Sequence, residues 1–169
     1  MWVFGFVLAF ILIIAIVGYN KIKFVEQTVS AISDINAVKQ RYAINFRGSV
    51  HDRAIAIRDI VLLDDIEEIE KTLKLIQNLE EFYKDSAIKM DEIFRNPTMV
   101  DAKDKEVLEQ IKKVESKTMP LILEILTKKA QGDLVEANAL LINQARNAFT
   151  EWLGIINVFI DHQEAKIKP

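Results

Sequence analysis

The chain has 169 residues, of which 22 are Lys or Arg and 25 are Asp or Glu, so its formal net charge is −3. Without a basic excess, nucleic acid is a poor candidate for a partner, and the lack of cysteine excludes disulfides and thiolate metal sites. Only five glycines and three prolines interrupt a sequence that is 50% hydrophobic and 28% charged. This scarcity of helix breakers predicts an all-α fold.

The N-terminal segment is strongly apolar. Residues 2–18 contain no charged side chain, and Trp2 and Tyr19 stand at the two ends of the run. About 20 apolar residues suffice for a helix to cross a bilayer, and aromatic side chains favour the membrane interfaces. We therefore expect residues 1–20 to form a transmembrane helix that contacts the membrane through residues 2–19.

Two observations qualify this prediction. A cleaved signal peptide is the alternative, although no small-x-small cleavage site precedes Asn20 and the helical pattern continues without a break. Lys21 and Lys23 follow the apolar run and nothing basic precedes it, so the positive-inside rule taken alone places the remainder of the chain in the cytoplasm.

Turn signals divide the remaining residues, 21–169, into four helices. The breaks fall at Asp64-Asp65, at Arg95-Asn96-Pro97 and at Gln131-Gly132-Asp133. The predicted helices span about 21–63, 66–95, 102–130 and 134–167, and Pro120 should kink the third or remove one hydrogen bond from it. Short connections between long helices predict an up-down-up-down antiparallel four-helix bundle, with its first helix continuous with the transmembrane helix.

The first of these helices has two apolar faces. One broad face, which predicts the bundle core, carries Val25, Val29, Ile32, Ile35, Tyr42, Phe46, Val50, Ile57, Ile60 and Val61. A second, narrower stripe consists of Ile44, Ile55 and Leu62. A helix in a simple bundle needs only one apolar face, so the stripe indicates a parallel homodimer; apolar residues exposed by chance are the alternative.

Basic residues gather in the distal half of the same helix. Arg47, His51 and Arg58 recur at helical spacing on one face, beside the apolar stripe, and we expect Asp52 and Asp59 on the opposite face. Arg53 falls instead near the centre of the core face, where an arginine is costly unless it is paired. It forms either a salt bridge to a neighbouring helix or part of an anion site, since guanidinium groups bind carboxylates in a bidentate manner.

The fourth helix offers polar groups at the same level, namely Asn143, Gln144, Arg146, Asn147 and Thr150. These groups could complete the hydrogen bonds of a ligand, or they could form an ordinary solvated face. The candidate ligand-binding residues are Arg47, His51, Arg53, Arg58, Asn143, Asn147 and Thr150. Catalytic motifs are absent, so we expect neither an enzyme nor a cofactor or metal site, and His162 is expected on a solvated surface.

Residues 118–166 resemble the second half of the four-helix-bundle ligand-binding domain of bacterial methyl-accepting chemotaxis proteins. The resemblance rests on Pro120, the Gly132-Asp133 turn, the Glu136-Ala137 step, Trp152 and the run from Phe159 to Glu164. The segment from Asn45 to Leu62 likewise resembles the first ectodomain helix of such receptors. The resemblance implies a periplasmic homodimer in the inner membrane whose cytoplasmic signalling part is absent here, with Arg47, Arg53, Arg58 and Thr150 at positions similar to those that hold the ligand.

We therefore expect a periplasmic sensor that binds a small organic anion, such as a dicarboxylate, a tricarboxylate or an amino acid, and that signals across the membrane. One alternative keeps the fold as the input domain of a histidine kinase or a cyclic-dinucleotide enzyme. Another is a membrane-anchored structural coiled-coil protein without a ligand. A dimer seam without a cavity near Arg47 and Arg58 would favour that last alternative.

Overall fold

The structure is a computed structural model that describes the backbone of residues 2–167 and the side chains of residues 14–23 and 33–167. This part of the chain consists of helices and the turns between them, without a strand. The elements are α1 (Trp2–Leu62), α2 (Ile66–Phe94), α3 (Ala102–Ala130), α4 (Leu134–Leu140), the π-helical turn η1 (Leu141–Ala145) and α5 (Arg146–Ile167). The predicted all-α class is confirmed, whereas the π-helical turn inside the fourth bundle helix was not predicted.

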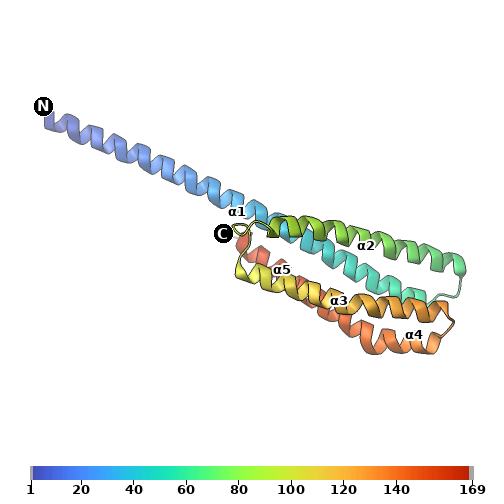
Figure 1. The fold of residues 1–169 in the computed structure, drawn as a ribbon. Coiled ribbons are helices and arrows are strands. Elements are labelled where there is room, and N and C mark those ends of the chain that lie inside the picture. Colours follow the sequence, from blue (N-terminus) through green and yellow to red (C-terminus); the bar gives the residue numbers. More distant parts are fainter. Residues whose placement is uncertain (1, 168–169) are drawn as a thin grey trace.

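Consecutive long helices run side by side in opposite directions, an arrangement consistent with a four-helix bundle (Figure 1). Helix α1 packs mainly on α2 and α5, and α3 packs on α4 and α5. With 61 residues, α1 is about 90 Å long, and its first half projects from the bundle as a single rod (Figure 1). We call this end of the bundle proximal and the opposite end, with the Leu63–Asp65 and Gln131–Asp133 turns, distal.

The predicted transmembrane helix falls largely outside the described residues, because the side chains of residues 1–13 are not among them. Among the residues that the structure does describe, none of the helices has a stretch apolar enough, over sufficient length, to span a bilayer. Contact with a membrane through residues 2–19 therefore stays a prediction.

Several helix ends are explained by local chemistry. Asp65 caps α2 by accepting a hydrogen bond from the Glu68 amide at 3.0 Å, as side-chain oxygens do at helix N-termini. Gly132 adopts a φ of +79° after α3, a left-handed conformation that suits glycine because it has no Cβ. Asp133 then caps α4 through the Glu136 amide at 3.2 Å. Helix α3 continues through Pro120.

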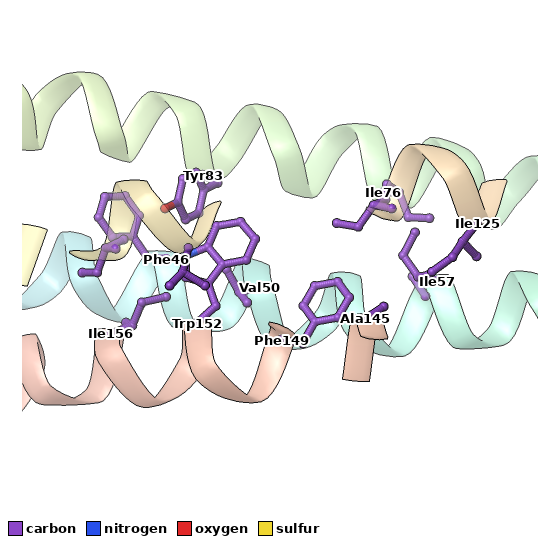
Figure 2. Packing of buried hydrophobic residues seen from close by; sticks show 14 of the residues in the cluster. Phe46, Val50, Ile57, Ile76, Tyr83, Ile125, Ala145, Phe149, Trp152 and Ile156 are labelled. Atoms are coloured by element: carbon purple, nitrogen blue, oxygen red, sulfur yellow. The ribbon is translucent and has the colours of Figure 1, made fainter. Parts of the chain in front are cut away.

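The core runs along the bundle axis and is filled by aliphatic and aromatic side chains (Figure 2). Trp152 of α5 is fully buried and meets Tyr83 of α2 edge to face, with ring centroids 5.5 Å apart. Phe46 of α1 lies 4.5 Å from the same tyrosine ring. Aromatic pairs in such geometry stabilise a core beyond their buried area, so this cluster joins α1, α2 and α5 at mid-height.

Both predicted faces of α1 can be compared with the structure. On the core face, Phe46, Val50, Ile57, Ile60 and Val61 are buried. Ile35 and Tyr42 are partly buried, and the side chains of Val25, Val29 and Ile32 lie outside the described residues. The second stripe is exposed: 50% of Ile44, 37% of Ile55 and 66% of Leu62 is accessible to solvent. The stripe therefore lies outside the core of this chain.

Candidate functional site

An open cleft of about 370 Å³ lies between α1 and the η1–α5 segment, in the distal half of the bundle. Ligand sites typically have volumes of this order and combine apolar walls with a few polar groups. The polar groups at its margin are His51, Arg58, Arg146 and Thr150. The apolar wall consists of Ala54, Ile55, Leu141, Ile142, Phe149 and Leu153. We call this feature the distal cleft.

The structure brings three of the predicted ligand-binding residues together in the distal cleft: His51 and Arg58 from α1, and Thr150 from α5. Arg47, Asn143 and Asn147 are exposed and are not among the residues that line it. Arg146 supplies a second guanidinium to the cleft. From the sequence it was expected at the level of the basic residues of α1, but it was not among the candidate ligand-binding residues. Helical spacing identified the level of the cleft, but not which side chains at that level face α1.

The acidic neighbours of α1 lie closer to the basic residues than expected. Arg58 Nη2 lies 3.2 Å from the Asp59 carboxylate, and His51 Nδ1 lies 3.0 Å from that of Asp52. The expectation that Asp59 lies on the opposite face from Arg58 did not anticipate this ion pair, because the long arginine side chain reaches around the helix to the adjacent residue. Both pairs are more than 40% exposed, and exposed pairs contribute little, so an incoming anion could displace these acids.

The backbone is irregular where it borders the distal cleft. Leu141 and Ile142 belong to the π-helical turn η1 and line the cleft on one side. A π-turn inserts one residue into an α-helix, and such turns are frequent at functional sites. Thr150 donates its hydroxyl proton to the Arg146 carbonyl at 2.9 Å, so its oxygen remains available as an acceptor. The cleft thus combines two cations, an apolar wall and a locally rearranged helix.

Comparison with protein families adds to this geometry. Residues 1–167 match the model of the family described as a four helix bundle sensory module for signal transduction. The chain belongs to this family. A search of the curated proteins and a search of the solved structures each found no match to this chain. The sensory module accounts for the helical bundle, and the resemblance expected from the sequence is confirmed.

Arg53 lies in the core of the sensory module, away from the distal cleft, with an exposed fraction of 2%. Its guanidinium carbon stands 5.2 Å from the centre of the Tyr83 ring and 5.1 Å from that of Trp152. Nη1 contacts the Met119 sulfur at 3.5 Å, whereas Nε and Nη2 have no hydrogen-bond partner among the described atoms. Arg53 therefore acts as a packed cation between aromatic rings, and neither alternative weighed for it from the sequence describes this environment.

The carboxylates nearest to Arg53 act on its pKa without forming an ion pair with it. Burial lowers the pKa of Arg53, while the charges of Glu80 and Glu115 and the Tyr83 hydroxyl act in the opposite direction. Glu115 accepts a hydrogen bond from the Tyr83 hydroxyl at 3.1 Å. Burial raises the pKa of Glu115, and burial followed by the nearby Glu115 charge raises the pKa of Tyr83.

A second polar group of residues, the proximal cluster, lies at the end of the bundle from which α1 projects. It comprises Lys39 from α1, Asp101 and Asp104 from the start of α3, and His162, Gln163 and Lys166 from α5. Of these residues, only His162 was expected to lie at a stated place, and its side chain is 23% exposed and lies 3.2 Å from Asp101. His162 is thus only partly solvated, because the N-terminus of α3 packs beside it.

The proximal cluster is an ion-pair network rather than an open metal site. Asp101, Asp104 and His162 offer ligand atoms within 4.8 Å of one another. The ammonium group of Lys166 already lies 2.8 Å from Asp101 and 3.0 Å from Asp104, and that of Lys39 lies 2.6 Å from Asp104. These cations occupy the carboxylate oxygens that a metal ion would need.

Proposed function

We propose that this sensory module is the periplasmic ligand-sensing domain of a chemotaxis transducer, anchored in the bacterial inner membrane through residues 2–19. Its ligand is a small organic anion that binds in the distal cleft, and its output is a signal across the membrane. The observation that carries the proposal is the pair of guanidinium groups, Arg58 and Arg146, at the margin of a cleft of about 370 Å³ with apolar walls.

The chemistry of the cleft defines the class of ligand. Arginine binds carboxylates through two parallel hydrogen bonds, and Arg58 and Arg146 approach the cleft from opposite helices. The Thr150 oxygen can accept a hydrogen bond from a hydroxyl or ammonium group of the ligand. Ile55, Ile142 and Leu153 favour a body with carbon surface over a bare inorganic ion. Dicarboxylates, tricarboxylates and amino acids all satisfy these conditions.

A second copy of the chain would complete the cleft. Ile55 belongs both to the exposed apolar stripe of α1 and to the wall of the distal cleft, and Ile142 beside it is 55% exposed. A homodimer through Ile44, Ile55 and Leu62 would cover these side chains and close the cleft toward solvent. Because the chain has no cysteine, a single cysteine in place of Leu62 should form a disulfide-linked dimer, whereas one in place of Glu109 on α3 should not.

Calorimetry of the full chain in lipid nanodiscs, titrated with succinate, citrate and the common amino acids, tests the ligand proposal. We expect at least one of these anions to bind, and we expect Arg58→Ala and Arg146→Ala each to weaken its binding by about tenfold or more, the cost of one lost charge-assisted hydrogen bond. Arg47→Ala is the matched control, since Arg47 is exposed outside the cleft. If no anion binds, or if Arg47→Ala has the same effect as Arg58→Ala, the assignment of the cleft fails.

A further inference from the structure

The basic groups at the margin of the distal cleft are not equally available to a ligand. Arg58 Nη2 lies 3.2 Å from the Asp59 carboxylate. His51 Nδ1 lies 3.0 Å from that of Asp52. Arg146 of α5, by contrast, has no carboxylate within 4.0 Å among the described residues. The Arg146 guanidinium is therefore the cation at this cleft that is ready to bind a carboxylate through two parallel hydrogen bonds.

Away from this margin, carbon surface walls the cleft on both sides. Ala54 and Ile55 come from α1, and Phe149 and Leu153 come from α5. Two side chains of the wall are partly in water, since Ile55 is 37% and Ile142 of η1 is 55% exposed. An apolar body placed between them removes carbon from water on both sides, which strengthens binding by up to about fourfold for each buried methylene group.

An ammonium group is poorly matched to this cleft. The described residues that line it include neither Asp nor Glu, and Thr150 carries the only side-chain oxygen among them. An ammonium has three donors, so one hydroxyl oxygen leaves it incompletely paired. It would also lie near the positive charges of Arg58 and Arg146. The amino group of an amino acid therefore weakens binding at this site.

A second carboxylate on the ligand is poorly matched as well. With the first carboxylate on Arg146, the second would compete with Asp59 for Arg58, or with Asp52 for His51. This competition gains little, because it exchanges one carboxylate for another. The remaining choice is to leave water against the apolar wall, and a charged group that loses water without a partner opposes binding.

We propose that the ligand is a monocarboxylate with an apolar body, either a branched aliphatic acid or an arylalkanoic acid. Its carboxylate binds Arg146, and its body lies between Ile55 and Ile142. This inference rests on the proposed function and narrows its class of ligand. Among the anions already named for titration, phenylalanine and leucine should then bind more tightly than succinate and citrate.

Two matched pairs of ligands test the proposal by calorimetry on the full chain in nanodiscs. Glutarate differs from pentanoate by a carboxylate in place of the terminal methyl group, and 3-phenylpropionate is phenylalanine without its ammonium group. In each pair we expect the simple monocarboxylate to bind about tenfold more tightly. Along the series propionate, butyrate and pentanoate, each methylene group should strengthen binding by up to about fourfold.

Variants of the wall connect these preferences to the cleft. Ile142→Ser removes carbon from the wall and should weaken binding of 3-phenylpropionate by about threefold or more. The matched control is Ile88→Ser on α2, since Ile88 is 51% exposed and lies outside the cleft. Ile142→Asp supplies a carboxylate for an ammonium group and should reduce the preference for 3-phenylpropionate over phenylalanine. Heat that remains with Arg146→Ala measures partition into the lipid and is subtracted.

The proposal is overturned if glutarate binds as tightly as pentanoate, or phenylalanine as tightly as 3-phenylpropionate. Equal effects of Ile142→Ser and Ile88→Ser would overturn it too. If Arg58→Ala and Arg146→Ala still weaken anion binding in those cases, the proposed function stands and only the class of ligand is wrong. If none of these anions binds to the wild-type chain, the proposed function itself fails, and this inference with it.

Discussion

Two cations are buried among the side chains that the structure describes, and they are accommodated in opposite ways. Lys39, at the proximal end, is fully buried and lies 2.6 Å from the Asp104 carboxylate. Arg53, at mid-height, is 2% exposed and lies between the rings of Tyr83 and Trp152. Within the described part of the chain, Arg53 forms no ion pair at 4.0 Å or less.

The difference follows from the two head groups. An ammonium is compact and strongly hydrated, so it needs a carboxylate when it leaves water; a guanidinium is planar, more weakly hydrated and stacks on aromatic faces. The Lys39 site is therefore directional and specific to one position of its partners. The Arg53 site tolerates small displacements, because the attraction of a cation to a ring has no single hydrogen-bond geometry.

The largest loss of stability is expected when the ion pair between Lys39 and Asp104 is broken. Asp104→Asn leaves the Lys39 ammonium buried without a charged partner, and we expect a loss of about 3–5 kcal/mol in the free energy of unfolding. Urea unfolding followed by circular dichroism measures it. Lys39→Met with Asp104→Leu should recover most of this loss, since neither charge remains. A double variant as unstable as Asp104→Asn alone would contradict this account of the site.

The second largest loss of stability is expected when the guanidinium of Arg53 is replaced by an ammonium group. Arg53→Lys places a strongly hydrated ammonium where no carboxylate is within reach, and the loss of ring stacking should cost about 2 kcal/mol. Arg53→Met removes the charge altogether and should lie within about 1 kcal/mol of wild type. The same urea unfolding experiment compares the two variants. If lysine is tolerated as well as methionine, the aromatic rings do not hold the cation.

Lowering the pH should reduce the stability that the proximal cluster contributes and increase the stability contributed near Arg53. The pKa values of Asp101 and Asp104 are lowered in the folded state, so the stability they add is complete above the unfolded value near 3.9 and is lost as the pH falls below it. The pKa of Glu115 near Arg53 is raised by burial, so protonation there favours the folded state. We expect urea midpoints to fall as the pH is lowered from about 5 to about 2 in wild type, and to fall less in Lys39→Met with Asp104→Leu.

Much of the fold follows from local signals in the sequence. Helix ends depend on residues that act on their immediate neighbours, such as Asp65, Asp133 and Gly132, and helical spacing alone separates the core face of α1 from its exposed stripe. The same spacing placed Arg53 in the core. Lys39 stands seven residues before Phe46, so this signal was also present for Lys39 but was not used.

The functional details depend on contacts between distant segments, which spacing does not define. The partner of Lys39 is 65 residues away along the chain, and the rings around Arg53 come from α2 and α5. No residue pattern predicts the π-helical turn η1, two of whose residues, Leu141 and Ile142, line the cleft. The sequence therefore predicted the level of the distal cleft, with His51, Arg58 and Thr150, but not its exact membership.

The smallest expected effect separates the ring of Tyr83 from its hydroxyl. Tyr83→Phe keeps the aromatic face over Arg53 and removes only the hydrogen bond to Glu115, so we expect a loss of about 1 kcal/mol. Tyr83→Leu removes the ring as well and should cost clearly more, because it removes both the packing with Trp152 and the ring contact of the buried Arg53 guanidinium. Urea unfolding of both variants at neutral pH makes the comparison. Equal losses would mean that the hydroxyl and its acceptor, rather than the aromatic ring, stabilise the buried arginine.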